Sequence, residues 1–267
     1  MNLGHAFRAM RGILKRELYR FVQQRGRLFS AIVRPLVWLL VFATGFRSIL
    51  GVSIIPPYET YIPYPVYIIP GLLGMILLFN GMQSSLSMVY DREMGMMRLL
   101  MTAPLPRWYL LLGKMLAGTV VSILQSYGFL AVCFLLDYRV PLWGLLAVFP
   151  VLVLVGFALC ALGLLLSTRI VQMENFAAVM NFVIFPMFFL SSALYPLWRV
   201  LEGSTVMYYL ALANPFTYAV ELIRFSLYGT FYPEGLAVIG GALLVFSLLG
   251  IQGYNPQKGM SHRAIAN

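Results

Sequence analysis

The chain has 267 residues, of which 61% are hydrophobic and 10% are charged, and its mean hydropathy is +0.84. Soluble domains are about half apolar and about a quarter charged, so this composition excludes a soluble globular protein and indicates a protein of the lipid bilayer. The formal net charge of +10 is compatible with a nucleic-acid partner, but the cations gather at the ends of the apolar segments. We therefore expect the lipid bilayer, and no nucleic acid, as a partner of this chain.

Six apolar windows are long enough, or nearly so, to cross a hydrocarbon core of about 30 Å as helices. They cover residues 28–50, 66–89, 111–136, 142–167, 176–197 and 236–251. The sixth window is short, and the fifth contains Pro186. A porin-like barrel would instead show alternating segments of about ten residues. The prediction is an all-α polytopic membrane protein, a single domain over residues 1–267 with six transmembrane helices.

The cations also predict the orientation of the chain. Seven of them, opposed only by Glu17, precede the first window: Arg8, Arg11, Lys15, Arg16, Arg20, Arg25 and Arg27. More follow in the loop 90–110 and in the tail 252–267, whereas the alternate loops are poorer in cations. By the positive-inside rule both termini and the loop 90–110 face the cytoplasm.

Two shorter helices are expected beside the windows. Apolar residues recur at steps of three or four over residues 1–27, which predicts an amphipathic helix on the inner membrane surface. It serves either as a topology anchor or as a second contact with a cytoplasmic partner. Between windows five and six, Asn214-Pro215 begins and Gly229 ends a helix too short to span, which indicates a re-entrant or interfacial element on the outer side. Glu221 and Arg224 lie one turn apart on it and are able to pair.

Several single residues receive structural interpretations. Arg34 and Lys114 lie near window ends, where their long side chains are expected to reach the headgroups. Gly113-Lys114 is no phosphate-binding loop, because Trp108 stands where that pattern needs its first glycine. Small residues at helical spacing in window four predict close helix packing, and they are Gly156, Cys160, Gly163 and Ser167.

The positions of the ionisable residues disfavour two classes of function, ion-coupled transport and intramembrane catalysis. No acidic residue lies near the middle of a window, and the two histidines, His5 and His262, lie in the tails. Ion-driven transporters usually carry an ionisable group at mid-membrane, and an intramembrane hydrolase needs a buried nucleophile with a base or metal ligands. We therefore expect no catalysis, and no cofactor or metal bound by this chain. Energy would have to come from an ATPase docked on the cytoplasmic face.

The loop 90–110 has the features of such a docking surface. It begins with a charged triplet and continues with apolar residues at helical spacing, and prolines then end the segment: Asp91, Arg92 and Glu93; Met94, Met97, Leu100 and Met101; Pro104 and Pro106. Methionines form adaptable contact surfaces, so a short helix here suits a cleft in a partner. A helix that merely rests on the lipid is the alternative.

Two ordered motifs resemble the type-2 (ABC-2) permease family of ATP-binding-cassette (ABC) transporters, which includes bacterial nodulation-factor, polysaccharide and drug exporters. They are Asp91-Arg92-Glu93-x-Gly95, with Leu99 to Leu105 and Gly113-Lys114, and Asn214-Pro215-Phe216-Thr217-Tyr218-Ala219-Val220-Glu221-x-x-Arg224. The resemblance covers nearly the whole chain. It implies an exporter permease of the bacterial cytoplasmic membrane, which pairs with a second copy or a close relative. Two copies of a separate ATP-binding subunit would hold ATP and magnesium.

The same resemblance implies roles for particular residues. A coupling helix would lie at residues 91–104, and its candidate contacts are Asp91, Arg92, Glu93, Met94, Gly95, Met97, Arg98, Leu100 and Pro104. The candidate pathway residues are Trp38, Phe42, Phe185, Phe188 and Phe189, and those of the outer helix are Asn214, Pro215, Glu221 and Arg224. An amphiphilic substrate is expected: lipid-linked, glycan or hydrophobic small molecule. The alternatives are a permease of the haem-export or cytochrome-maturation type, and a membrane scaffold that transports nothing.

Overall fold

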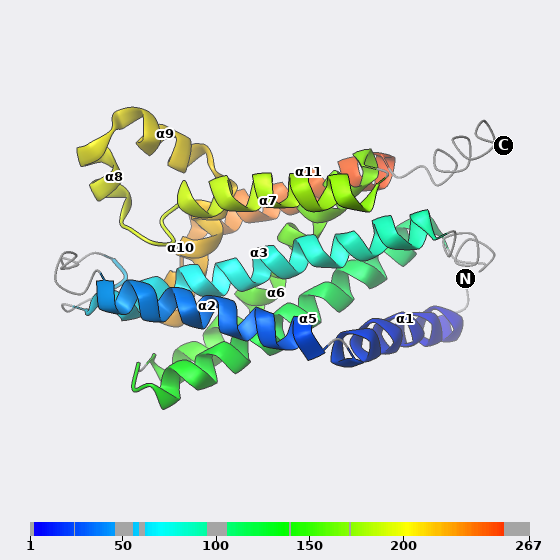
Figure 1. Ribbon diagram of the computed structural model, residues 1–267, viewed down its shortest axis with the longest axis horizontal. Helices are drawn as coiled ribbons and strands as arrows, with labels where there is room; N and C mark the ends of the chain where they lie inside the picture. Colours follow the sequence, from blue (N-terminus) through cyan, green and yellow to red (C-terminus); the bar gives the residue numbers. More distant parts are fainter. Residues whose placement is uncertain are drawn as a thin grey trace.

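The computed structural model describes residues 3–23, 25–45, 56–58, 62–94, 106–138, 140–170 and 172–253. Within these ranges the chain forms helices and no β-strand, which confirms the predicted all-helical class. The helices form an elongated bundle (Figure 1), and the start of α1 and the end of α11 lie at the same end of it. We call this the α1 end, and we call the opposite end, where α10 lies, the α10 end.

Ten helices follow one another along the described part of the chain. They are α1 (Leu3–Gln23), α2 (Arg25–Gly45), α3 (Tyr64–Glu93), α5 (Arg107–Leu135), α6 (Leu142–Arg169), α7 (Met173–Phe189), α8 (Leu197–Gly203), α9 (Thr205–Ala213), α10 (Pro215–Leu227) and α11 (Pro233–Gly253). Each apolar window corresponds to one of α2, α3, α5, α6, α7 and α11. Among the described residues four helices, α3, α5, α6 and α11, are long and apolar enough to cross a membrane. The apolar parts of α2 and α7 are shorter, at Ile32–Phe42 and Met173–Phe189.

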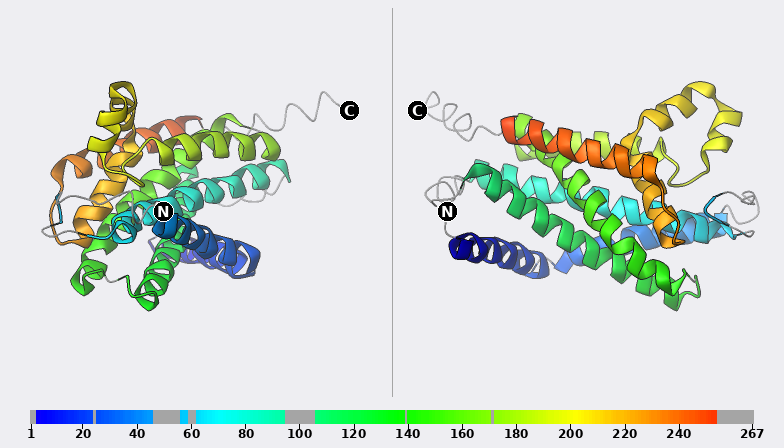
Figure 2. Two further views of the ribbon diagram at one scale, coloured as in Figure 1. Left: turned by 60° about the vertical axis from the view of Figure 1, so that its left-hand side comes forward. Right: turned by 180° about the vertical axis from the view of Figure 1, so that it is seen from behind.

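Helix α3 lies at the centre of the bundle. It packs against α2, α5, α6, α7 and α10, and it is apolar on every side over most of its 30 residues, as a helix buried all round must be. Its neighbour α6 also contacts α5, α10 and α11. Figure 2 shows the long helices crossing one another at shallow angles, while α8 and α9 stand away from the bundle.

Small residues let α6 approach α3 and α5 closely. A Cβ atom added to Gly156 would lie 2.8 Å from Cγ2 of Thr119, and one added to Gly163 would lie 2.6 Å from Oγ of Ser85. Neither glycine has space for a Cβ atom beside it, so a larger residue at either position would separate the helices. The packing role predicted for the small residues of window four is confirmed.

The prediction for window five is wrong in its extent. Helix α7 ends at Phe189 instead of continuing to residue 197, and an irregular segment, 190–196, leads to two short helices that the sequence analysis did not predict. Pro186 lies in the last turn and has no N–H group to extend the helix ladder. The carbonyl groups at the end of α7 find side-chain partners instead, as described below.

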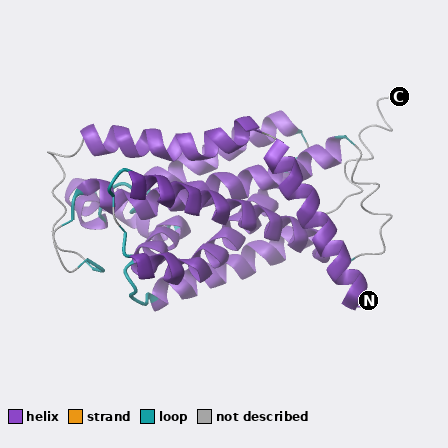
Figure 3. Ribbon diagram, turned by 90° about the horizontal axis from the view of Figure 1, so that it is seen from below, coloured by secondary structure: helices purple, strands orange, loops and turns teal. Residues whose placement is uncertain are grey.

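Helix α1 packs against α5 and meets α2 at an angle, which Figure 3 shows near the N-terminus. Its contact with α5 passes over Gly113, where an added Cβ would lie 3.2 Å from Ile13 and 3.3 Å from Sδ of Met10. Phe7, Tyr19 and Val22 are exposed. The amphipathic helix predicted for the N-terminal segment is present, and its position on a membrane surface stays a prediction.

Helix α10 is held inside the bundle by α3, α6 and α11. The apolar face of this helix, which consists of Phe216, Val220, Ile223 and Leu227, is fully buried. Of the two predicted alternatives, this burial favours a re-entrant element over a helix that lies at an interface with lipid headgroups.

Candidate functional site

The charged end of α3 forms a buried network at the α1 end. Asp91 is 2% exposed, and Nζ of Lys114 on α5 donates a hydrogen bond of 2.5 Å to its Oδ2. Nη2 of Arg16 on α1 lies 3.4 Å from the same oxygen and 2.8 Å from Glu17. One buried carboxylate therefore links three helices through a buried lysine and a partly exposed arginine.

The next residue, Arg92, reaches the end of a fourth helix. Its Nη1 donates to the carbonyl oxygen of Ser167 at 3.2 Å and to that of Ile170 at 3.3 Å. The last carbonyl groups of a helix have no partner within the helix, and a cation at that end also interacts favourably with the helix dipole. Arg92 thus caps α6 from α3, and the last turn of α3 is fixed to α1, α5 and α6.

This geometry corrects the interpretation of Gly113-Lys114. Lys114 is 7% exposed and pairs with Asp91, so its side chain does not extend to the headgroups as predicted. The dipeptide serves two neighbours of α5, because Gly113 makes room for α1 and Lys114 binds α3. Asp91, predicted as part of a docking surface, directs its carboxylate into its own chain.

The exposed part of the predicted coupling segment begins directly after Arg92. Glu93 and Met94 are both exposed, and α3 ends between them. The other predicted coupling residues, Gly95, Met97, Arg98, Leu100 and Pro104, lie outside the described residues. The structure thus places the start of the α3–α5 connection, at the α1 end, on top of the Asp91 network.

The five aromatic residues predicted to line a pathway lie together between α2 and α7. Trp38 stacks on Phe42 with ring centres 5.3 Å apart, and its indole meets Phe189 at 5.8 Å and Phe188 at 6.2 Å. Phe185 stacks on Phe189 at 6.3 Å. Phe188 is 1% exposed and therefore belongs to the core, whereas Phe185 is 44% exposed. We call these five residues the aromatic cluster.

Asn214 connects the end of α7 to the start of α10. Its Oδ1 accepts a hydrogen bond from the N–H of Phe216 at 3.0 Å, the arrangement of a helix N-cap. Its Nδ2 donates to the carbonyl oxygens of Met187 at 2.8 Å and Leu190 at 2.6 Å. The predicted N-cap is present, and the same side chain also satisfies α7 carbonyl groups that lack partners within their helix.

Arg224 is the second fixed point of the α10 end. It is 2% exposed, and its Nη1 pairs with Glu221 one turn earlier, as predicted. Its Nη2 donates to the carbonyl oxygen of Ser192 at 2.8 Å, and its guanidinium carbon lies 4.2 Å from the ring centre of Tyr67. Tyr67 donates to the same carbonyl at 3.1 Å. Together these groups fasten segment 190–196 to α3 and α10.

A family model described as ABC-2 type transporter matches residues 8–228, a range that begins in α1 and ends just after α10. The chain belongs to this family. It is a transport permease, a membrane component of an ABC transporter. The interpretation drawn from the two sequence motifs is thereby confirmed at the level of the family.

Relatives of this ABC-2 permease cover most or part of the chain. A protein of Cyanophora paradoxa whose name assigns it as a transport permease (ycf38) is 30% identical over 214 residues, which are 77% of this chain and 70% of that protein. Its namesake from Porphyra purpurea is 27% identical over 203 residues, 74% of this chain and 66% of that protein. An Escherichia coli K12 protein whose name assigns it as a multidrug ABC transporter permease (YbhR) is 31% identical over 129 residues, 47% of this chain and 35% of that protein.

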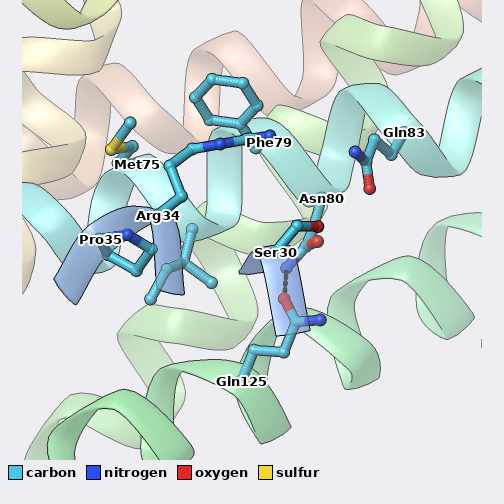
Figure 4. Close-up of a pocket in the computed structure, with 9 residues that line it drawn as sticks. Ser30, Arg34, Pro35, Met75, Phe79, Asn80, Gln83 and Gln125 are labelled. Carbon is cyan, nitrogen blue, oxygen red and sulfur yellow. Dashed lines mark hydrogen bonds between the residues drawn. The ribbon is translucent and has the colours of Figure 1, made fainter. Parts of the chain in front are cut away.

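A group of polar side chains between α2, α3 and α5 of this ABC-2 permease was not predicted from the sequence. Figure 4 shows Arg34 of α2 lying across Phe79 of α3, and Asn80 of α3 bonded to Gln125 of α5. These side chains belong to a pocket, the Arg34 pocket, whose lining residues are Ser30, Arg34, Pro35, Met75, Ile76, Phe79, Asn80, Gln83 and Gln125. Arg34 therefore does not reach the headgroups as predicted. The signal was present in the sequence, because Asn80, Gln83 and Gln125 interrupt otherwise apolar windows.

Proposed function

We propose that this permease is the transmembrane subunit of an ATP-driven exporter. It acts as a dimer, and a separate ATP-binding subunit drives it through residues 91–104. The observation that carries this proposal is the Asp91 network. The exposed start of the α3–α5 connection directly follows Asp91 and Arg92, whose side chains contact α1, α5 and α6. A partner that moves this connection would move α1, α5 and α6 with it.

The type of contact supports this role. An ion-paired side chain can exchange its partner for another one within reach. A closely packed apolar core does not deform gradually and changes only between discrete arrangements. Arg16 already lies between two carboxylates, Glu17 and Asp91. A small displacement of α3 would shift Arg16 from one to the other without leaving a buried charge unpaired.

For the topology we propose six spans with both termini in the cytoplasm. Helices α2 and α7 would be the two short spans, and the α1 end would face the cytoplasm. The cations of α1 support this orientation through the positive-inside rule. We propose the bacterial cytoplasmic membrane as the location; the relatives come from Escherichia coli and also include plastid-encoded ycf38 proteins.

The substrate proposed is an amphiphile. Two mainly apolar pockets open on the bundle, one at the outer ends of α5 and α6 and one between the end of α7 and helices α8 and α9. The aromatic cluster borders the second pocket through Phe189. Apolar walls of this kind suit a lipid-linked, glycan-bearing or hydrophobic molecule.

The test is co-expression with an ATP-binding subunit of the same transporter and reconstitution of the complex in lipid vesicles. ATP hydrolysis and export are compared for the wild type, Glu93→Ala and Gly95→Pro, with Glu202→Ala on exposed helix α8 as the matched control. We expect both coupling variants to lower stimulated hydrolysis and export severalfold while the complex still forms, and the control to match the wild type.

Other results would overturn the proposal in different ways. Unchanged hydrolysis and export in both coupling variants would refute coupling through residues 91–104. If no ATP-binding subunit associates, the scaffold alternative replaces transport. If the purified complex holds one copy of this chain together with a different assembly protein, the haem-export type replaces the dimeric exporter.

A further inference from the structure

Arg34 places a charged group at the middle of the bundle. Its guanidinium carbon lies 4.0 Å from the centre of the Phe79 ring. Phe79 is midway along α3, about 21 Å from either end at 1.5 Å per residue. Charged residues at this depth are costly, and they usually face a bundle interior or a cavity and mark a pathway. The contact with the aromatic face offsets only part of that cost.

The described part of the chain supplies no counter-charge for Arg34. Within the described ranges Arg34 forms no ion pair and no side-chain hydrogen bond. The acidic residues in those ranges lie on α1, at the ends of the long helices, in a loop, or on α8 and α10: Glu17, Asp91, Glu93, Asp137, Glu174, Glu202, Glu221 and Glu234. A second copy would bring the same set and so adds no carboxylate at that depth.

Neutral hydrogen-bonding groups share the pocket with Arg34. They are Ser30, Asn80, Gln83 and Gln125, and they come from three helices. Gln125 is 2% exposed, and its Nε2 has no hydrogen-bond partner among the described residues, although its Oε1 accepts from Asn80. A buried amide donor without a partner costs about 1–3 kcal/mol, so its presence calls for an acceptor. A planar guanidinium beside amide N–H groups matches the oxygen atoms of a phosphate or carboxylate.

The surroundings of the pocket indicate which kind of molecule would carry this phosphate or carboxylate group. Arg34, Trp38 and Phe42 follow one another at four-residue steps and therefore share one face of α2. The aromatic cluster thus begins one helical turn beyond the pocket in one direction. In the other direction the Arg34 pocket shares Asn80 with a second pocket, lined among others by Glu17, Ser84 and Ser87, which extends toward α1. An apolar surface and a polar surface meet at Arg34.

We propose that the Arg34 pocket binds the oxyanion group, phosphate or carboxylate, of an amphiphilic substrate whose apolar part lies along the aromatic cluster. Arg34 neutralises the charge, Gln125 donates a hydrogen bond, and Trp38 contacts the apolar part. The inference rests on the proposed function, since it names the substrate class of the exporter. It places recognition inside each copy, between α2, α3 and α5.

Binding to the purified permease in phosphatidylcholine nanodiscs tests the assignment without any ATPase. The probe is radiolabelled dodecyl phosphate, and the competitors are unlabelled dodecyl phosphate, 1-dodecanol and inorganic phosphate. The variants are Arg34→Gln, Arg34→Lys and Gln125→Leu, with Arg169→Gln at the exposed end of α6 as the control that removes the same charge. We expect Arg34→Gln to weaken binding at least about tenfold, Arg34→Lys to weaken it less, and Arg169→Gln to leave it unchanged.

Each outcome decides the proposal. Wild-type affinity in Arg34→Gln, or equal loss in Arg169→Gln, overturns the site. Displacement of the probe by inorganic phosphate at a similar concentration overturns the amphiphile in favour of the free ion, and equal displacement by 1-dodecanol overturns the oxyanion. If Arg34→Gln does not fold, Arg34→Lys and Gln125→Leu decide in its place. ATPase coupling without Arg34-dependent binding refutes this inference alone, and binding without ATPase association refutes the proposed function alone.

Discussion

The two ends of the bundle hold a buried charge in different ways. At the α10 end, Arg224 pairs with Glu221 of its own helix and donates to a backbone carbonyl of segment 190–196. At the α1 end, Asp91 is bound by the side chains of Lys114 and Arg16, which belong to two other helices. A backbone acceptor stays where the fold puts it, whereas a side-chain partner can be exchanged. The buried charge at the α10 end is thus held by a backbone acceptor, whereas the buried carboxylate at the α1 end is held by side chains, as the coupling proposed for residues 91–104 requires.

The largest effect is expected from breaking the fixed end. Arg224→Ala leaves Glu221 without its partner in the bundle and removes the link to Ser192, and removal of one member of a buried pair costs about 3–5 kcal/mol. We expect a low yield of folded protein. The yield is measured by detergent extraction followed by size-exclusion chromatography. Arg224→Lys keeps the charge and should recover part of the yield. Normal yield of Arg224→Ala would contradict the fixed-end description.

The next largest effect is expected at the α1 end. Asp91→Ala leaves Lys114 buried without its carboxylate, and we expect a loss of about 2–4 kcal/mol because this lysine lies only about two turns into α5 and is closer to water than Arg224. Urea unfolding in mixed micelles measures the change. The double variant Asp91→Leu with Lys114→Met should recover most of the stability. Additive losses in the double variant would show that the two side chains do not interact.

A smaller effect is expected for Asn214, whose bonds are uncharged. Asn214→Ala removes the α10 cap and two donors to α7, and we expect a loss of about 1–3 kcal/mol by the same urea unfolding. Asn214→Asp keeps an acceptor for the N–H of Phe216 but loses both donors. The stability of this variant should therefore fall between that of the wild type and that of Asn214→Ala. An Asp variant as stable as the wild type would mean that the α7 carbonyl groups need no donor.

The smallest effect is expected where a charged pair is exposed. Arg199 and Glu202 lie 3.1 Å apart on α8, with 43% and 58% of their side chains exposed. Such pairs contribute little, so Glu202→Ala should change the unfolding free energy by less than about 0.5 kcal/mol. A loss comparable to that of Asp91→Ala would show that burial does not explain the difference between the sites.

The helices were predictable from the sequence where periodicity and length decide them. Windows two, three, four and six match α3, α5, α6 and α11 within a few residues, because long apolar runs have few other ways to fold in a membrane. Window five was too long because the composition stays apolar through residue 197, while Pro186 and the side-chain caps from Asn214 end the helix at Phe189. Hydropathy does not record such long-range caps.

The site was predictable in part. Glu221 and Arg224 pair as predicted, because spacing along a helix brings them to one face. The five aromatic residues lie together, although they come from α2 and α7, and their place on a pathway stays a prediction. Lys114 and Arg34 were assigned to the headgroups because their partners, Asp91 and Phe79, lie on other helices. A single sequence gives the distance of a cation from the end of a window, and it does not show which neighbouring helix that cation meets.

The double role of Asn214 has a consequence for the chain between residues 190 and 214. A single amide group closes this stretch at its base, since it touches both Leu190 and Phe216. Helices α8 and α9 therefore form a loop that leaves the bundle and returns to the point where it left. Near its turn, Gly203 has no neighbour within 4 Å of an added Cβ. A peptide tag inserted between Gly203 and Ser204 should leave the bundle intact and give antibodies and fluorophores access to the folded protein.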